Sequence, residues 1–297
     1  MRPRWLRGNL HTHTTNSDGD SDPATVTAWY RDADYDFLAL TDHDRLTETA
    51  ALADAAGRMV LVPAEEVSSG PAHVNGFGIR TQVTPARRGS ARESWQADID
   101  AIRAAGGLPQ VNHPNFVWQA GPDDLAALTG APLVEIWNGS PDCNDRGRPG
   151  HPSSEELWDR ALTAGSRIWG TATDDAHHFR RWGRAWANPG RGWVCVRSRT
   201  LAEPAILAAL EAGDFYASTG VRLLDIVSEA DALRVLVAAR GDLHYTTTFI
   251  GAGGQVLGVE HGAEAVYRRS GREPYVRARV DDSDGLSAWV QPVFPGG

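Results

Sequence analysis

The stretch Asn9-Leu10-His11-Thr12-His13, followed by Ser17-Asp18-Gly19, is the part of this sequence from which the fold can be inferred. Side chains two residues apart on an extended segment point to the same side, so His11 and His13 can face one metal ion. The Asp18 carboxylate lies close by in the following loop. Imidazole together with carboxylate suits zinc, manganese or iron better than calcium. The stretch therefore predicts a metal site at the end of a strand.

Further histidine and carboxylate residues follow other apolar runs along the chain. They occur in Thr41-Asp42-His43, Glu65-Glu66, His73, Asn112-His113-Pro114 and Thr173-Asp174-Asp175-Ala176-His177-His178. Most of them stand where a predicted strand ends, and the carboxyl ends of parallel strands in a barrel meet at one mouth. The sequence therefore predicts a metal centre with several ions, and a hydrolase built around it.

Short β-like runs alternate with helical stretches through the first 220 residues. Predicted strands cover residues 5–11, 37–41, 59–63, 73–79, 108–111, 133–137, 167–171 and 193–197. Predicted helices begin at Asp22-Pro23, run over 94–105 before Gly106-Gly107, and run over 154–164 between a Ser153/Glu156 capping box and Gly165. This alternation favours an α/β class with a parallel sheet, closed or nearly closed into a barrel.

The pattern changes after residue 220. Strands are predicted at 222–229, 232–239, 245–250, 275–281 and 288–294, separated by glycine or aspartate turns and interrupted by no long helix. We expect a domain over residues 1–220 and a small antiparallel β appendage over residues 221–297, either separate or packed against the first domain.

Composition narrows the function further. The 297 residues carry a formal net charge of −9, which argues against stable binding to a nucleic-acid backbone. All 29 basic residues are arginine, and without lysine there is no Schiff-base or pyridoxal-phosphate chemistry. Cys143 and Cys195 predict reduced thiols rather than a disulfide framework. We find no apolar run long enough to span a membrane and no apolar signal-peptide core, so a cytoplasmic protein is expected.

The ordered set of motifs resembles the polymerase-and-histidinol-phosphatase (PHP) superfamily of metallohydrolases. The resemblance implies a distorted (β/α)7 barrel that binds two or three divalent ions of manganese, zinc or iron. Three further runs, Glu135–Gly139, Phe215–Gly220 and Ala288–Pro292, are similar to the branch that includes carbaryl hydrolase.

The resemblance also implies roles for single residues. The ligands would be His11, His13 and Asp175 for a first ion; Asp18, His43 and His177 for a second; and His73 and His113 for a third, with Glu66 bridging the first and third. Glu66 fits the family pattern better than Glu65, and alternation on a strand lets only one of the two face the site. Asp42 and Asp174 are expected to hold ligand imidazoles in their tautomer.

The expected reaction is hydrolysis by a hydroxide that bridges two ions, in which Glu66 takes part through the ions and His178 donates a proton. Arg45, Asn115, Arg180 and Arg222 are candidates for binding the substrate. Three functions remain open at this point. They are a phosphoesterase for a small phosphoester or nucleotide, a carboxyl- or carbamate-ester hydrolase with an apolar pocket, and a metal-binding module without turnover. The sequence predicts a small anionic or ester substrate and leaves the oligomeric state open.

Overall fold

The first part of the chain alternates strands with helices, as the periodicity predicts. A computed structural model describes residues 3–295. The strands of this part are β1 (Arg4–Asn9), β2 (Phe37–Leu40), β3 (Val60–Ser69), β4 (Ala72–Phe77), β5 (Leu108–Val111), β6 (Leu133–Asn138), β7 (Trp169–Thr173), β8 (Trp193–Ser198) and β9 (Phe215–Ser218). The helices are α1 (Pro23–Asp32), α2 (Ala53–Ala56), α3 (Ala91–Ala104), α4 (Asp124–Ala127), α5 (Ser154–Thr163) and α6 (Glu203–Ala212), with short 3₁₀ turns η1 (Ala50–Leu52) and η2 (Phe116–Trp118).

The helix starts follow the predicted capping chemistry. Asp22 caps α1 by accepting a hydrogen bond from the Thr25 amide, and Pro23 occupies the first turn. Ser153 and Glu156 form the predicted capping box of α5. The helix predicted over 94–105 begins three residues earlier, at Ala91, because Ser90 and Glu93 form a second capping box.

The first seven strands form a mixed sheet rather than a fully parallel one. The pairs β1–β2, β2–β3, β5–β6 and β6–β7 are parallel. In contrast, β4 is antiparallel to both β3 and β5, because β3 and β4 form a hairpin that turns at Gly70 and Pro71. Gly70 has a φ of 75°, a left-handed conformation that glycine adopts at little cost. This hairpin departs from the predicted parallel order.

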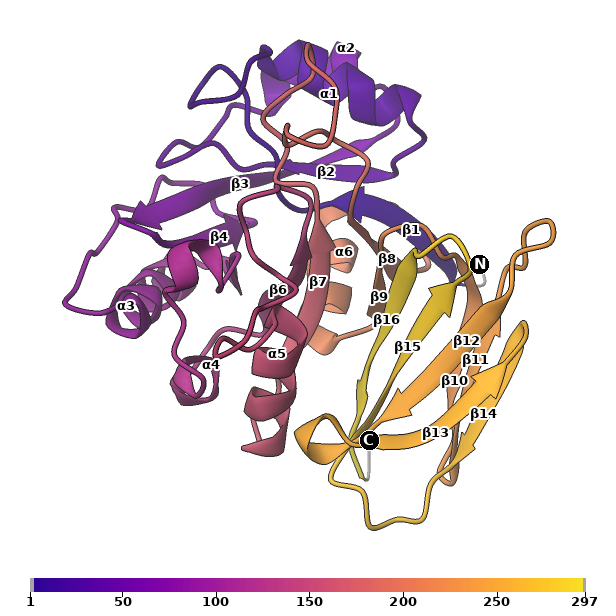
Figure 1. The fold of residues 1–297 in the computed structure, drawn as a ribbon. Helices are drawn as coiled ribbons and strands as arrows, with labels where there is room; N and C mark the ends of the chain where they lie inside the picture. The colour runs from indigo at the N-terminus through magenta and orange to yellow at the C-terminus, as the bar shows by residue number, and fades with distance from the viewer. Residues whose placement is uncertain (1–2, 296–297) are drawn as a thin grey trace.

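The C-terminal strands extend the same sheet. They are β10 (Leu223–Ser228), β11 (Ala232–Val237), β12 (Tyr245–Ile250), β13 (Val256–His261), β14 (Glu264–Arg268), β15 (Val276–Asp282) and β16 (Ser287–Val293), with a 3₁₀ turn η3 (Ala252–Gly254). Because β16 pairs with β9, a sheet of 13 strands runs in the order β13-β12-β15-β16-β9-β8-β1-β2-β3-β4-β5-β6-β7. Figure 1 shows β16 beside β9, where the two parts of the chain meet. A second sheet contains β10, β11 and β14.

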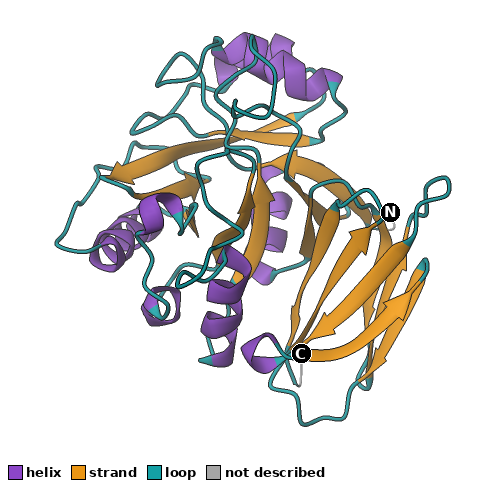
Figure 2. Ribbon diagram, viewed as in Figure 1, coloured by secondary structure: helices purple, strands orange, loops and turns teal. Residues whose placement is uncertain are grey.

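The five strands predicted after residue 220 are confirmed, and β13 and β14 are two that the prediction missed. The α/β class is confirmed, and Figure 2 shows the C-terminal part to be almost entirely strand. Within residues 3–295 the sheet is not closed, since its hydrogen-bonded order ends at β7 and β13. The count of seven β/α units and the domain boundary at residue 220 therefore stay predictions.

Three apolar clusters hold these layers together. One lies under α3 and α5, where Trp95 and Trp158 are fully buried. A second lies under α6, around Phe37 and Phe215. The third joins Tyr30 of α1 and its neighbours to the C-terminal strands. Across residues 3–295, no helix is both long enough and apolar enough to cross a membrane.

Candidate metal centre

The loops that leave the parallel strands bring the candidate ligands together. β1 ends at Asn9, two residues before the predicted end at His11, so both His11 and His13 lie just beyond the strand. A β-bridge between Thr12 and Ala176 ties this loop to the one after β7, which carries Asp175 and His177. A second bridge joins His43, after β2, to Glu66 on β3.

The loop after β1 is fixed by its own short contacts. The Asp42 carboxylate accepts hydrogen bonds from the Thr14 amide at 2.8 Å and from the Ser17 hydroxyl at 2.9 Å. Gly19 lies so close to this loop that a Cβ there would be 2.6 Å from the carbonyl oxygen of His13. The Ser17-Asp18-Gly19 run therefore needs glycine at its last position to hold Asp18 over the histidines.

Glu66 and Asp175 lie at the bottom of the cluster, between the first two histidines. The Nε2 atom of His11 is 3.2 Å from Glu66 Oε1 and 3.2 Å from Asp175 Oδ1. The Nε2 atom of His13 is 3.2 Å from Asp175 Oδ1 and 3.4 Å from Glu66 Oε2. All four side chains are buried, so these charged and polar atoms face one another away from bulk solvent.

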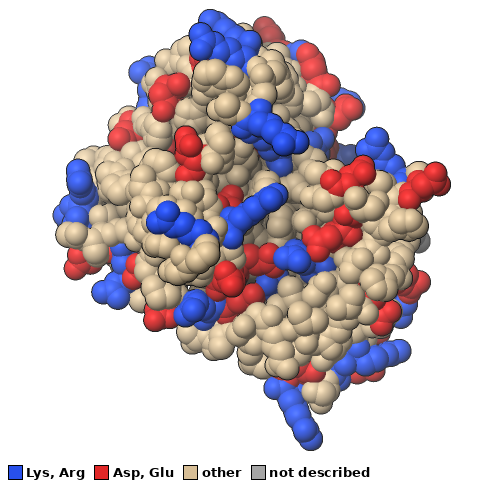
Figure 3. Space-filling model, in the orientation of Figure 1, with Lys and Arg blue, Asp and Glu red and all other residues tan. Residues whose placement is uncertain are grey.

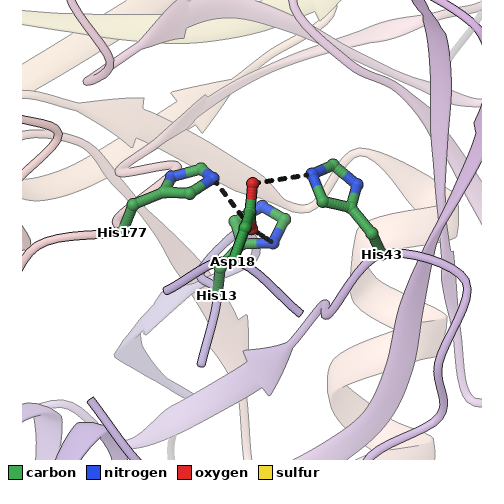
Figure 4. Close-up of side chains that lie close together, drawn as sticks. All are labelled: His13, Asp18, His43 and His177. Carbon is green, nitrogen blue, oxygen red and sulfur yellow. Dashed lines mark ion pairs between the residues drawn. The ribbon is translucent and has the colours of Figure 1, made fainter. Parts of the chain in front are cut away.

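A second group lies nearer the solvent. Figure 4 shows Asp18 between His13, His43 and His177. Its carboxylate oxygens are 3.4 Å from His177 Nε2, 3.5 Å from His43 Nε2 and 3.6 Å from His13 Nδ1. The Asp18 side chain is 54% exposed, so this group is open to exchange with solvent.

Glu66 also reaches the side of the cluster formed by β4 and β5. Its Oε1 atom is 3.0 Å from His73 Nδ1 and 3.3 Å from His113 Nε2, and its Oε2 atom is 2.9 Å from His43 Nδ1. Glu65 points away and accepts a hydrogen bond from the Val83 amide. The strand therefore turns Glu66 toward the cluster, as the alternation argument expects.

The nine predicted ligands fall into four overlapping groups that could each hold a cation. These groups are His13, Asp18, His43 and His177; His11, His13 and Glu66; His11, His113 and Asp175; and His43, Glu66 and His73. Within each group one donor atom per residue lies within 4.8 Å of the others. That these residues bind metal ions stays a prediction.

Several buried atoms of the cluster lack a hydrogen-bond partner. They are His11 Nε2, His13 Nε2 and His113 Nδ1. A buried polar atom without a partner costs about 1–3 kcal/mol, so these unpartnered nitrogens on three candidate ligands fit a bound cation. Imidazole nitrogen and carboxylate oxygen together suit first-row divalent ions. The residues present therefore fit the divalent ions that the motifs imply.

The charges of the cluster shift its pKa values strongly. Burial lowers the pKa of His11, but the carboxylates of Asp175 and Glu66 outweigh burial and raise that pKa well above its ordinary value. Burial also lowers the pKa of His43, but the carboxylates of Glu66 and Asp18 outweigh burial and raise that pKa to about 11. Burial and the neighbouring His177 lower the pKa of His13 to about 4. Protons on the imidazoles thus balance the carboxylate charge, and divalent ions bound at the same atoms would displace them.

Glu135, on β6, supports the cluster from below and was missed as a functional residue. Its buried carboxylate accepts hydrogen bonds from His11 Nδ1 at 2.7 Å and from the His113 amide at 2.7 Å. It also accepts from Asn138 Nδ2 at 2.8 Å and Thr173 Oγ1 at 2.6 Å. These bonds fix the His11 ring so that Nε2 faces the cluster.

Asp42 and Asp174 do not hold imidazoles, contrary to the prediction. Asp42 anchors the loop after β1, as described above. Asp174 accepts hydrogen bonds from the Tyr30 hydroxyl and from the amides of Arg191 and Gly192. Each carboxylate therefore positions the loop that carries the ligands, and Glu135 orients the imidazole.

A cavity of about 370 Å³ opens over the cluster. Its walls include Phe116, Pro141, Cys143, His178 and Trp186 beside the candidate ligands. The His178 ring packs on Trp186 with 4.8 Å between ring centroids, and its Nδ1 atom has no hydrogen-bond partner. His178 thus lies at the cavity wall, and its role as a proton donor stays a prediction.

The predicted substrate-binding residues do not line this cavity. Arg45 and Arg180 are exposed on loops after β2 and β7, and Arg222 is exposed just before β10. Asn115 is buried and donates its side-chain amide to the carbonyl oxygens of Asn144 and Pro152. The structure gives none of the four a contact with the cavity, and their role in binding substrate stays a prediction.

Comparison with known proteins supports the fold. No known family model and no curated protein matches the sequence. A two-domain protein from Bacteroides vulgatus, described as containing a predicted PHP-like metal-dependent phosphoesterase, aligns with a TM-score of 0.58 over 97% of this chain and 95% of its own. The two chains share a fold. At 13% identity the likeness supports the PHP resemblance at the level of fold alone.

Two further structures align less well. One is an amidohydrolase from Chromobacterium violaceum with bound sulfate and no metal, at 18% identity and a TM-score of 0.40 over 58% of this chain and 88% of its own. The other is a candidate metal-dependent phosphoesterase from Bifidobacterium adolescentis, at 16% identity and a TM-score of 0.43 over 63% of this chain and 91% of its own. The carbaryl-hydrolase-like branch finds no support among these structures.

Proposed function

We propose that this protein is a metal-dependent hydrolase of the PHP type and that it cleaves small phosphoesters. One observation carries the proposal: four overlapping groups of imidazole and carboxylate donors, linked through His11, His13 and Glu66, lie beneath a cavity. Divalent ions bound there would lower the pKa of a coordinated water to about 7 and thus supply a nucleophile at neutral pH.

The protein residues supply the remaining requirements. Glu66 and Asp175 are buried acceptors that draw cations to the cluster, and Glu135 holds His11 in the orientation that binding needs. His178 lines the cavity and, when protonated, would be the side chain that gives a proton to the leaving oxygen. No serine or cysteine nucleophile is required, so the thiol of Cys143 acts only as part of the wall.

The residues that line the cavity favour a substrate whose negative charge is balanced by the bound ions. Among the described residues no arginine lines this cavity. The charge of a phosphoryl group would therefore be balanced by cations held at the cluster rather than by guanidinium groups. The cavity volume of about 370 Å³ limits the substrate to a small molecule.

A carboxyl- or carbamate-ester hydrolase is the second candidate, and the same wall supports it. Phe116, Pro141 and Trp186 give the cavity an apolar side, and within residues 3–295 no guanidinium lines it to select phosphate. A neutral ester with an apolar leaving group would fit this wall without charge compensation.

Parallel assays separate these functions. The protein, loaded with manganese or zinc, is assayed with p-nitrophenyl phosphate, bis-p-nitrophenyl phosphate and p-nitrophenyl acetate. Turnover of a phosphoester with strong inhibition by inorganic phosphate supports the first candidate, and turnover of the acetate that is indifferent to phosphate supports the second. Bound metal without any turnover would support the third, non-catalytic alternative.

Two substitutions test whether the cluster is the reaction centre. His11→Ala and Asp175→Ala should abolish turnover and lower the bound metal per chain. His244→Ala, which replaces an exposed histidine outside the cluster, is the control and should change neither. Wild-type turnover by metal-depleted protein would overturn the proposal.

A further inference from the structure

A second cavity, of about 600 Å³, lies where the N-terminal strands meet the C-terminal ones. We call it the junction cavity. Trp137 of β6, Arg146 and Arg191 line one side, while Arg279 of β15 and Trp289 of β16 line the other. It shares no lining residue with the cavity over the metal cluster. Figure 3 shows arginine and acidic side chains meeting in the middle of this face, over the junction.

The acidic groups of the junction cavity are already engaged. Glu155 accepts hydrogen bonds from Arg277 at 2.8 Å and from Arg279 at 3.1 Å. Asp145 accepts from the Asn138 amide at 2.6 Å and the Ser154 hydroxyl at 3.1 Å. Burial also raises the pKa of Asp145 to about 7, so its negative charge is incomplete at neutral pH.

Two guanidinium groups of the cavity form no ion pair among the described residues. Within residues 3–295, neither Arg146 nor Arg191 forms a side-chain ion pair with a carboxylate, although the Asp174 carboxylate lies near enough to Arg191 to act on its charge and accepts a hydrogen bond from its backbone amide. Arg191 is held in place, because it donates hydrogen bonds to the carbonyl oxygens of Gly139 and Gly183 and to Asn188 Oδ1. Arg146 forms no hydrogen bond through its side chain and is exposed at the rim. Guanidinium groups bind carboxylates and phosphates through charge-assisted hydrogen bonds. The junction cavity offers two such groups, Arg191 held in place and Arg146 free at the rim.

The remaining wall is aromatic. The rings of Trp137 and Trp289 are nearly parallel, with an interplanar angle of 27° and 6.2 Å between centroids. The Arg146 guanidinium lies 5.7 Å from the centre of the Trp137 ring. The buried Nε1 atom of Trp137 has no hydrogen-bond partner among the described residues. An indole face beside a cation is a surface on which a planar ring packs favourably.

We propose that the junction cavity binds a small planar anion, an aromatic carboxylate or phosphate, at a site separate from the metal cluster. Arg146 and Arg191 bind the anionic group, and Trp137 packs against the ring. The cavity volume of about 600 Å³ is in the range of sites for small molecules. The site does not depend on the proposed hydrolase activity, because none of its residues lines the other cavity.

Calorimetric titration of the metal-loaded protein tests the proposal. The probes are 1-naphthoate and 1-naphthylphosphonate, which present one ring with two kinds of anion and carry no ester to hydrolyse. Their comparison decides between a carboxylate and a phosphate ligand. The neutral 1-naphthalenemethanol has the same ring and should bind at least about tenfold more weakly than the preferred anion, because it lacks the charge-assisted hydrogen bonds.

The decisive comparison is between two arginines of one loop. Arg146→Ala should weaken binding of the preferred anion about tenfold or more. Arg148→Ala is the matched control, since the Arg148 guanidinium lies over Trp118, outside the junction cavity, and this variant should bind as the wild type does. The proposal is overturned if neither anion binds the wild type, or if the two variants bind equally well. Hydrolysis enters none of these readouts, so failure of the proposed function leaves them interpretable.

Discussion

Glu135→Gln is the substitution that tests most directly how the metal centre is supported. The two Glu135 oxygens accept four hydrogen bonds at 2.6–2.8 Å, from His11, His113, Asn138 and Thr173. Glutamine has nearly the same shape, but its amide nitrogen donates and cannot accept. Two of the four donors therefore lose their acceptor and face another donor, while the volume of the side chain is unchanged.

The expected loss follows from the role of His11. Removing the group that orients a ligand imidazole typically weakens metal binding about 10–100-fold, which corresponds to about 1.4–2.7 kcal/mol. The buried donors left unpaired would cost a further 1–3 kcal/mol or so of folding stability. We therefore expect Glu135→Gln to bind metal 10–100-fold or so more weakly and to unfold at a lower temperature.

Competition with a calibrated chelator, followed by elemental analysis of the protein, measures the metal affinity. Glu65→Gln is the control: Glu65 is buried on β3 next to Glu66 but faces away from the cluster. Burial raises the pKa of Glu65 to about 7, so a neutral amide at that position is a small change. Equal metal affinity in the two variants would refute the orienting role of Glu135.

Three further results are expected. In metal-free protein, the pKa values of His177 (about 9) and His43 (about 11) are raised, so protonation of these imidazoles stabilises the fold fully below pH 6.5 and less as pH rises toward those values. Melting temperatures should therefore fall between pH 6.5 and 9, and His177→Gln should make that fall smaller. Arg277→Ala leaves the buried Asp159 carboxylate without its partner and should cost about 3–5 kcal/mol in urea unfolding, whereas a loss below about 1 kcal/mol would contradict the buried ion pair. Gly19→Ala forces the loop after β1 to move and should lower the bound metal per chain, as measured by elemental analysis. An unchanged metal content would show that the loop tolerates a Cβ at this position.

The metal cluster could be predicted because its members stand at recognisable places in the sequence. His11 and His13 follow β1, His43 follows β2, and His113 follows β5, so each is marked by a strand whose apolar pattern ends there. The structure brings all nine candidate ligands together. Local pattern and strand order are sufficient for such residues because parallel strands converge at one edge.

The groups that support the cluster could not be predicted in the same way. Glu135 lies inside β6 and is separated from His11 by 124 residues, so only the register of the folded sheet brings them together. Asp42 and Asp174 are adjacent to ligands in sequence, which suggested contact with imidazoles, yet their carboxylates accept hydrogen bonds from backbone amides of the neighbouring loops. Sequence proximity is thus a weak guide to which polar group a buried carboxylate contacts.

In the C-terminal part, the pairing of the strands could not be predicted from the sequence. Its strands were predicted individually, but alternation within a strand carries no information about which neighbour it pairs with. The pairing of β16 with β9 through Val290 and Tyr216 continues the first sheet into the last strands. The junction cavity exists only because of that pairing, since Arg279 and Trp289 reach it from strands that follow residue 220.

Backbone strain at two candidate ligands links the cluster to its supports. His113 has a φ of 24° and Asp175 a φ of 46°, values that cost a non-glycine residue about 1–3 kcal/mol when the surroundings do not offset them. One backbone hydrogen bond fixes each segment. The His113 amide donates to Glu135, and the amide of Asp174, just before Asp175, donates to Asn9 Oδ1. Relaxed loops would point the two side chains elsewhere, and ions would then have fewer donors within reach. The strain therefore persists where the ligands must converge, and it is maintained by buried hydrogen bonds that no local pattern in the sequence reveals.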